Sequence, residues 1–299
     1  MVLRSMKTLR VLVPAIGLVM GTAVYAANTS DSPNNAAQQN SASAQQNQQG
    51  RTAGSMRASK LIGMPVRNAQ GEDLGKVQDL VIDVNNGDVY YAVLSFGGWM
   101  SMGDKLFAYP LRVFGLADNA NQLVLNIDKQ KLKDAPGFEA NRWPEWGRDR
   151  YRAEVDRYYG DKLTLQPRPN TVLRRASTLN DADVIDASGN DVGDVEDIVV
   201  DMRNGSVQYV VVDFDDDWAH NDRLTQLPLA AFRPSRSEQD KLVLRVNQQQ
   251  VATAPSFDEN NWPNLNDRNA QANVNRWFSD LGVDTTAAGD RNPPQRPQQ

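Results

Sequence analysis

The chain has 299 residues, enough for about two domains, with a formal net charge of −5 and no cysteine. The missing cysteine excludes disulfides, thiolate metal sites, a cysteine nucleophile and a lipoprotein anchor. The acidic balance argues against nucleic acid as a partner, because nucleic-acid binding needs a basic surface.

The first 26 residues have the pattern of a secretory signal. Arg4, Lys7 and Arg10 precede a short apolar run, Val11–Ala26, that ends in a small-x-small exit. We expect cleavage after Ala26 and a periplasmic or otherwise exported protein. The alternative is an uncleaved anchor, which would be the only membrane contact, although about 16 apolar residues are few for a span of about 20.

Both ends of the remaining chain lack a hydrophobic pattern. Residues 27–57 are rich in Gln, Asn, Ser and Ala, and residues 284–299 have a similar composition. Such segments bury too little apolar surface to offset the entropy of ordering. We therefore predict a disordered tether at residues 27–57 and a disordered tail at residues 284–299.

The middle of the chain repeats itself. GEDLGKVQDLVID, Gly71–Asp83, returns 118 residues later as GNDVGDVEDIVVD, Gly189–Asp201. The identical residues fall on every second position, which is the period of a β-strand. APGFEANRWP, Ala135–Pro144, also returns, as APSFDENNWP, so the repeated unit has about 100 residues.

Each copy reads as strands followed by a helix. In the first copy, Gln78–Val84 and Val89–Phe96 are predicted strands, and Asn86-Gly87 between them is a hairpin turn. Val81 and Ile82 are adjacent apolar residues, which indicates that both faces of the strand are covered, as in a small closed barrel with something packed outside. Residues 149–160 form an amphipathic stripe that we expect to lie against a barrel.

These elements predict a mainly β protein with short helices. The predicted fold class is two tandem small β-barrels, each followed by an amphipathic helix. Asp128 and Asn247 are predicted N-caps of short turns after the last strand of each barrel. The predicted boundaries are residues 58–160 for the first unit, 161–176 for a linker and 177–283 for the second unit.

The residues of the repeat resemble the PRC-barrel domain family, seen in the photosynthetic reaction-centre H subunit and in the ribosome maturation factor. The resemblance rests on LIGMPV, GEDLGKVQDLVID, GGWMSMGDKLFAYP and the closing aliphatic strand. It covers about Ser59–Asp128 and, more loosely, Thr178–Asn247, where GGWMSMGDK becomes DDDWAHNDR. Known members are mostly adaptors, so the resemblance implies docking onto a protein without catalysis.

The repeated aspartates belong to the fold in our interpretation. Asp79 and Asp83, with their counterparts Asp197 and Asp201, recur at the strand period. We expect them at a solvated edge, or accepting hydrogen bonds at the hairpin. A catalytic pair would need a partner base or nucleophile, which the sequence does not supply.

The stretch DFDDDWAHND, Asp213–Asp222, is the candidate cation site. An EF-hand loop fails here, because its required glycine is Trp218 and its twelfth position is Leu224. A single histidine, His220, cannot make the usual zinc cluster. We assign no metal and no cofactor, and the candidates for a weaker hard-cation site are Asp213, Asp215, Asp217 and Asp222.

The same tip in the first copy is apolar and is the candidate docking surface. Trp99, Met100 and Met102, with Trp218 in the second copy, are side chains that adapt to protein partners. The alternative is that they cover the barrel mouth. Trp143 and Trp262 are interpreted as structural plugs, with carbohydrate stacking as the alternative.

We expect a non-enzymatic protein-binding or adaptor module of the bacterial cell envelope. Its partner is expected to be another envelope protein. The alternative function is a periplasmic protein that binds a cation or small ligand through the acidic loop Asp213–Asp222.

Overall fold

The computed structural model describes residues 54–96, 105–117, 120–146, 149–159, 165–218, 223–235 and 237–282. The predicted signal segment, almost all of the predicted tether and the predicted tail lie outside these residues. Within them, no helix has the length and apolar character needed to cross a membrane.

The first domain is an eight-stranded sheet with the strand order β6-β7-β2-β3-β4-β5-β8 and one further strand, β9, paired with β3. Its own strands are β2 (Pro65–Arg67), β3 (Asp73–Asp83), β4 (Val89–Ser95), β5 (Lys105–Pro110), β6 (Phe114–Leu116), β7 (Leu123–Leu125) and β8 (Phe138–Glu139). Its helices are the single 3-10 turn η1 (Leu111–Val113), α3 (Lys129–Lys133) and α4 (Asp149–Tyr159).

The second domain repeats this order as β14-β15-β10-β11-β12-β13-β16, with β1 paired with β11. The strands are β10 (Asp183–Ile185), β11 (Asp191–Asp201), β12 (Ser206–Phe214), β13 (Arg223–Leu227), β14 (Phe232–Pro234), β15 (Lys241–Leu244) and β16 (Ser256–Asp258). Its helices are η2 (Leu229–Ala231), α6 (Gln248–Val251) and α7 (Arg268–Asp280). The predicted fold class, two tandem PRC-barrel-like units each trailed by a helix, is confirmed.

The strand β3 has a covered face on each side, as its adjacent apolar residues predict. Ile82 belongs to the main core, whereas Val81 belongs to a second cluster that includes Val155 of α4. Helix α4 therefore covers the outside of its own barrel. In the second domain Val274 of α7 packs in the same way against Val199.

Strand β3 is longer than the predicted strand, because a glycine within it adopts a backbone conformation that lets the strand bend and continue. Gly75 has φ +104°, and a Cβ there would lie 2.0 Å from the Ser95 carbonyl oxygen. Only glycine allows this close approach in the left-handed region. The predicted strand Gln78–Val84 misses residues 73–77 on both sides of this glycine, where β3 pairs with β2 at Asp73, Gly75 and Lys76.

The predicted N-caps are confirmed. The Asp128 carboxylate accepts from the backbone N–H groups of Gln130 and Lys131. The Asn247 side chain accepts from the Gln250 N–H, and the Gln250 side chain accepts in return from the Asn247 N–H, which completes a capping box.

The two domains exchange their lead-in strands. Strand β1 (Ser55–Arg57) precedes the first domain but pairs with β11 of the second, in the register Ser55↔Asp201. Strand β9 (Leu173–Arg175) precedes the second domain but pairs with β3 of the first, in the register Leu173↔Asp83. The two registers are the same under the 118-residue repeat, so the exchange is reciprocal.

This exchange corrects two predicted boundaries. Residues 55–57 form β1 and are not part of a disordered tether. Within the predicted linker, residues 173–175 form β9, and Ala176 begins the short helix α5 (Ala176–Leu179). The strands have three residues each and no apolar alternation of their own. They are strands because β3 and β11 each present an edge that their own domain leaves open.

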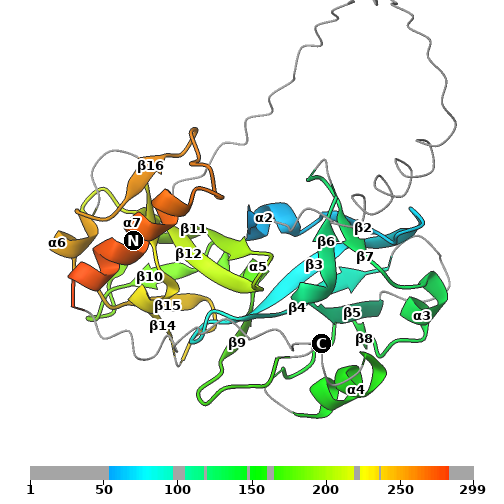
Figure 1. The fold of residues 1–299 in the computed structure, drawn as a ribbon. Coiled ribbons are helices and arrows are strands. Elements are labelled where there is room, and N and C mark those ends of the chain that lie inside the picture. Colours follow the sequence, from blue (N-terminus) through cyan, green and yellow to red (C-terminus); the bar gives the residue numbers. More distant parts are fainter. Residues whose placement is uncertain are drawn as a thin grey trace, which may run out of the picture. The chain divides into compact units, whose positions relative to one another are not determined.

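The short helices after the exchanged strands lie between the sheets. Helix α2 (Ala58–Leu61) follows β1 and packs against β11, and α5 follows β9 and packs against β3. Figure 1 shows both helices between the two domains. The hairpin tips also meet: the Val89 N–H donates to the Gly205 carbonyl at 2.8 Å, and the Val207 N–H donates to the Gly87 carbonyl at 2.7 Å.

One continuous hydrophobic cluster contains buried residues of both domains, including Leu80 and Ile198. We therefore predict that the described region unfolds as one cooperative unit. Leu80→Ala should cost about 2 to 5 kcal/mol and lower the hydrogen-exchange protection of amides in β11 and β12 as well as in β3. Loss of protection confined to the first domain would show that the domains unfold separately.

Candidate functional site

Asp197 of β11 is a buried carboxylate that holds the lead-in segment of the first domain. Its side chain is fully buried. It accepts from the Ser59 N–H at 3.1 Å, from the Ser59 hydroxyl at 2.5 Å and from Arg57 Nε at 2.5 Å. The first turn of α2 has no side-chain cap of its own, so Asp197 satisfies a helix N–H from the other domain.

Asp79 of β3 holds the second lead-in segment in the corresponding way. It accepts from the Ser177 N–H at 3.0 Å, from the Ser177 hydroxyl and from the Leu80 N–H at 2.8 Å. Burial raises the pKa of the Asp79 carboxyl above its usual range, and the hydrogen bonds from Ser177 and Leu80 oppose that rise. No described arginine hydrogen-bonds Asp79, whereas Arg57 pairs with Asp197.

Two arginines of the exchanged strands stack on the tryptophans of the repeat. The Arg57 guanidinium lies 3.7 Å from the centre of the Trp262 ring, and Arg175 lies 4.9 Å from that of Trp143. Each arginine belongs to the exchanged strand of one domain and stacks on an aromatic side chain of the other. Both tryptophans therefore make internal contacts of the kind expected of structural plugs.

These contacts decide between the two interpretations of the repeated aspartates. The solvated edge is wrong for all four aspartates, since each is buried. Acceptance of hydrogen bonds is confirmed, including at the hairpin, where Asp83 accepts from the Asn86 amide at 2.7 Å and Asp201 from Arg203 Nη2 at 2.8 Å.

The partners of the two central carboxylates were not predicted from the sequence. They are Arg57, at the end of the predicted tether, and Ser59 and Ser177, at the predicted starts of the first and second units. A signal for them exists in the sequence: Arg-Ala-Ser at residues 57–59 returns at residues 175–177, again 118 residues apart. The repeat therefore begins with the exchanged strands.

The acidic loop is only partly within the described residues. Asp222 and His220 lie outside them, as do Trp99, Met100 and Met102 of the first tip. Among the residues described, no three histidine, aspartate or glutamate side chains come together as a metal site. The pKa of Asp215 is raised by desolvation and by neighbouring carboxylates, which shows that negative charge is crowded here.

Trp218 is the predicted docking residue that the structure does describe. It is half-buried and stacks on Phe214, with ring centroids 6.0 Å apart and planes 12° apart. It lines a cavity of about 610 Å³ at one end of the second barrel, together with Arg233, Arg245 and Asp186. The Asp186 pKa is lowered, first by the Asn190 side chain and backbone.

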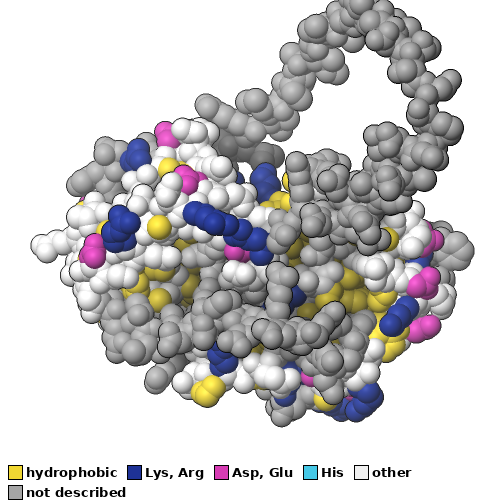
Figure 2. Space-filling view, in the orientation of Figure 1, with side chains coloured by type: hydrophobic (Ala, Val, Ile, Leu, Met, Phe, Trp, Pro, Cys, Tyr) yellow, Lys and Arg dark blue, Asp and Glu magenta, His cyan; other side chains and the backbone are white. Residues whose placement is uncertain are grey.

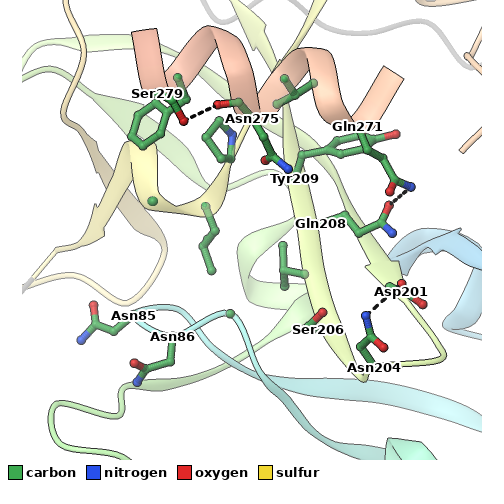
Figure 3. Close-up of a pocket in the computed structure, with 17 residues that line it drawn as sticks. Asn85, Asn86, Asp201, Asn204, Ser206, Gln208, Tyr209, Gln271, Asn275 and Ser279 are labelled. Carbon is green, nitrogen blue, oxygen red and sulfur yellow. Dashed lines mark hydrogen bonds between the residues drawn. The ribbon is translucent and has the colours of Figure 1, made fainter. Parts of the chain in front are cut away.

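A second cavity, of about 490 Å³, lies between α7, β12 and the hairpin tip of the first domain. Figure 3 shows α7 along one side and Asn85 and Asn86 of the first domain at the other. Most of its polar lining is neutral. Amide side chains contribute from both domains, and the Asp201 carboxylate is bound by Arg203. This cavity was not predicted from the sequence, because its walls come from four distant segments, within residues 85–87, 201–209, 228–230 and 271–279.

The PRC-barrel domain family model matches residues 53–132 and residues 172–251, together more than half of the chain. The chain therefore belongs to the PRC-barrel domain family, in two copies. Two copies of this domain suggest a non-catalytic module. Both matches begin just before an exchanged strand, so the family unit includes β1 and β9. None of the curated proteins compared with the chain matches it.

The two carboxylates make a matched pair for mutation. Asp197→Asn should destabilise the protein by about 3 kcal/mol, because Arg57 loses its partner in a largely buried site. Asp79→Asn should cost only about 1 kcal/mol, because an amide oxygen can still accept from Ser177. Urea denaturation at neutral pH measures both. Equal losses would show that the Arg57 ion pair adds nothing.

The raised pKa of Asp79 predicts a pH dependence of stability. The folded state binds the proton more tightly than the unfolded state, whose pKa is near 3.8, so the folded protein is favoured below that pH. That contribution to the free energy of unfolding is lost as the pH rises through the folded pKa. The wild-type protein should therefore lose stability relative to Asp79→Asn as the pH rises above 3.8. A constant difference would contradict this.

Proposed function

We propose that the chain is a non-enzymatic docking module of the bacterial cell envelope whose partner is another protein. The observation that carries the proposal is Trp218 beside an open cavity at the end of the second barrel. Membership in the PRC-barrel family supports it, because the barrels of that family mostly serve as adaptors.

Trp218 has the properties of an anchor for a protein partner. It is large, and its stacking on Phe214 restricts its rotamers, so that little conformational entropy remains to be lost on binding. Arg233 and Arg245 line the same cavity. Tryptophan and arginine are the residue types most enriched among those that dominate binding energy at interfaces.

The use of the buried carboxylates supports a role without catalysis. Asp79 and Asp197 direct their oxygens at helix N–H groups and at Ser59 and Ser177. Their hydrogen bonds connect the domains and leave these groups turned away from solvent. A catalytic acid or base would instead need access to a substrate.

The sequence and the surface support the proposed compartment and class of partner. The N-terminal pattern of residues 1–26 supports export, with an uncleaved anchor as the alternative. On the face seen in Figure 2, basic and acidic side chains are interspersed. A mixed surface on an acidic protein suits a protein partner better than nucleic acid.

Crosslinking in living cells, followed by purification of the tagged chain and mass spectrometry, tests the proposal. We expect a dominant partner whose recovery falls at least about tenfold in Trp218→Ala, the loss typical of an interface anchor. Trp277→Ala is the matched control, because Trp277 is also half-buried at the edge of the main core but does not line this cavity. Trp99, Met100 and Met102 changed to Ser test the first tip.

A partner recovered equally with every variant would contradict docking through these tips. The alternative function, cation binding by the acidic loop, would replace it if millimolar calcium raised the melting temperature of the wild-type protein but not that of Asp215→Asn. The crowding of carboxylates around Asp215 is the observation that favours this alternative.

A further inference from the structure

At one place the first domain is covered by a described segment of the chain, and none of the segments that the structure describes takes the equivalent place in the second domain. Residues 165–172 lead into β9 and lie along the outside of the first barrel. Leu165 packs in the cluster that contains Val155 of α4. The Tyr90 hydroxyl donates to the Gln166 carbonyl at 3.3 Å, and the Asn85 amide donates to the Asn170 carbonyl at 2.6 Å. We call residues 165–172 the inserted segment.

Charged side chains also hold the inserted segment. Arg168 pairs with Asp88 at 3.3 Å, and Arg152 of α4 donates to the Gln166 side chain at 3.2 Å. The segment contains Pro167 and Pro169, which favour an extended backbone.

In the second domain, the residues that correspond to these contact positions line the cavity beside α7. Positions in the strands correspond at an offset of 118 residues and those in the trailing helices at 119. The counterparts of Asp88, Tyr90, Arg152 and Val155 are Ser206, Gln208, Gln271 and Val274, and all four line the cavity of about 490 Å³. The cavity therefore occupies the place that the inserted segment occupies in the first domain.

One substitution within the repeat widens this place in the second domain. Arg112 of the first domain reaches to the opposite hairpin tip, where its Cγ would lie 3.4 Å from a Cβ on Gly205. Its counterpart is Ala230, which lines the cavity. A methyl group in place of the long arginine side chain leaves more room between α7 and the tip.

The cavity lining in the second domain also lacks two charged side chains that the first domain has at the equivalent positions. Asp88 becomes Ser206, and Arg152 becomes Gln271, whose amide donates to the Gln208 side chain at 2.8 Å. The carboxylate of Asp201 is bound through both of its oxygens by Arg203. An occupant therefore needs no charged side chain to match the lining, and backbone carbonyls and amides suit it well.

We propose that this cavity binds an extended, proline-containing and uncharged peptide segment of the partner protein. The inserted segment is the template for its conformation. The proposal rests on the proposed docking function and gives it a second surface, remote in sequence from the barrel tip. Extended proline-containing segments bind with a small loss of entropy, because they are already ordered.

A peptide with the sequence of the inserted segment, carrying Arg168→Gln, is the probe. Labelled with fluorescein, it should bind the full chain saturably, as measured by fluorescence anisotropy. Ala230→Arg restores the long side chain of the first domain and should weaken binding at least about tenfold. Asn275→Arg, at an exposed lining position on α7, should do the same without touching the core. Ala252→Arg adds the same charge at an exposed position outside the cavity and should leave binding unchanged.

A photo-reactive benzoylphenylalanine at Ser279 identifies the occupant. Crosslinks to the probe would support the proposal. Crosslinks to the chain's own residues before Gly54, without probe binding, would overturn it and make the cavity an internal site. Absent or variant-independent probe binding would also overturn it. If the partner captured in cells depends on Trp218 but not on Ala230→Arg, the cavity proposal fails while the docking function stands.

Discussion

Asp79 and Asp197 connect the domains because each carboxylate accepts hydrogen bonds from a helix turn that the other half of the repeat supplies. A carboxylate without water must find donors, and here the donors are the N–H and hydroxyl groups of Ser177 and Ser59. The exchanged strands, the short helices between the sheets and the stacked arginines all lie beside these hydrogen bonds. Neither domain is complete without residues that precede the other.

The local features of the fold were predictable from the sequence. The period-two identity of the repeat gave the long strands, Asn86-Gly87 gave the turn, and Asp128 gave a cap, because each of these is determined by nearby residues. Strand β1 was not predictable in the same way. Ser-Met-Arg has no pattern of its own and becomes a strand only because β11 offers an unpaired edge from about 140 residues away.

The candidate site was less accessible to sequence reasoning than the fold. Trp218 was identified because it lies at the tip of the second copy and because tryptophan is a side chain that adapts to protein partners. The cavity beside α7 was not, since it depends on Ala230 at the place of an arginine and on a helix that closes one wall. The substitution of Ala230 for Arg112 can be read from the repeat. That it enlarges a cavity becomes visible only when the two halves are compared in three dimensions.

The reciprocal exchange has a consequence for how such a chain can evolve. The open edge of a single PRC unit could be filled by the lead-in strand of a second, identical molecule, and reciprocal exchange of this kind closes a two-fold dimer. Both subunits of that dimer have the same sequence, so any mutation appears on the surface of both. Joining the two units in one polypeptide keeps the closed arrangement and ends that constraint. The two halves can then carry different side chains at equivalent positions, as Arg112 and Ala230 do.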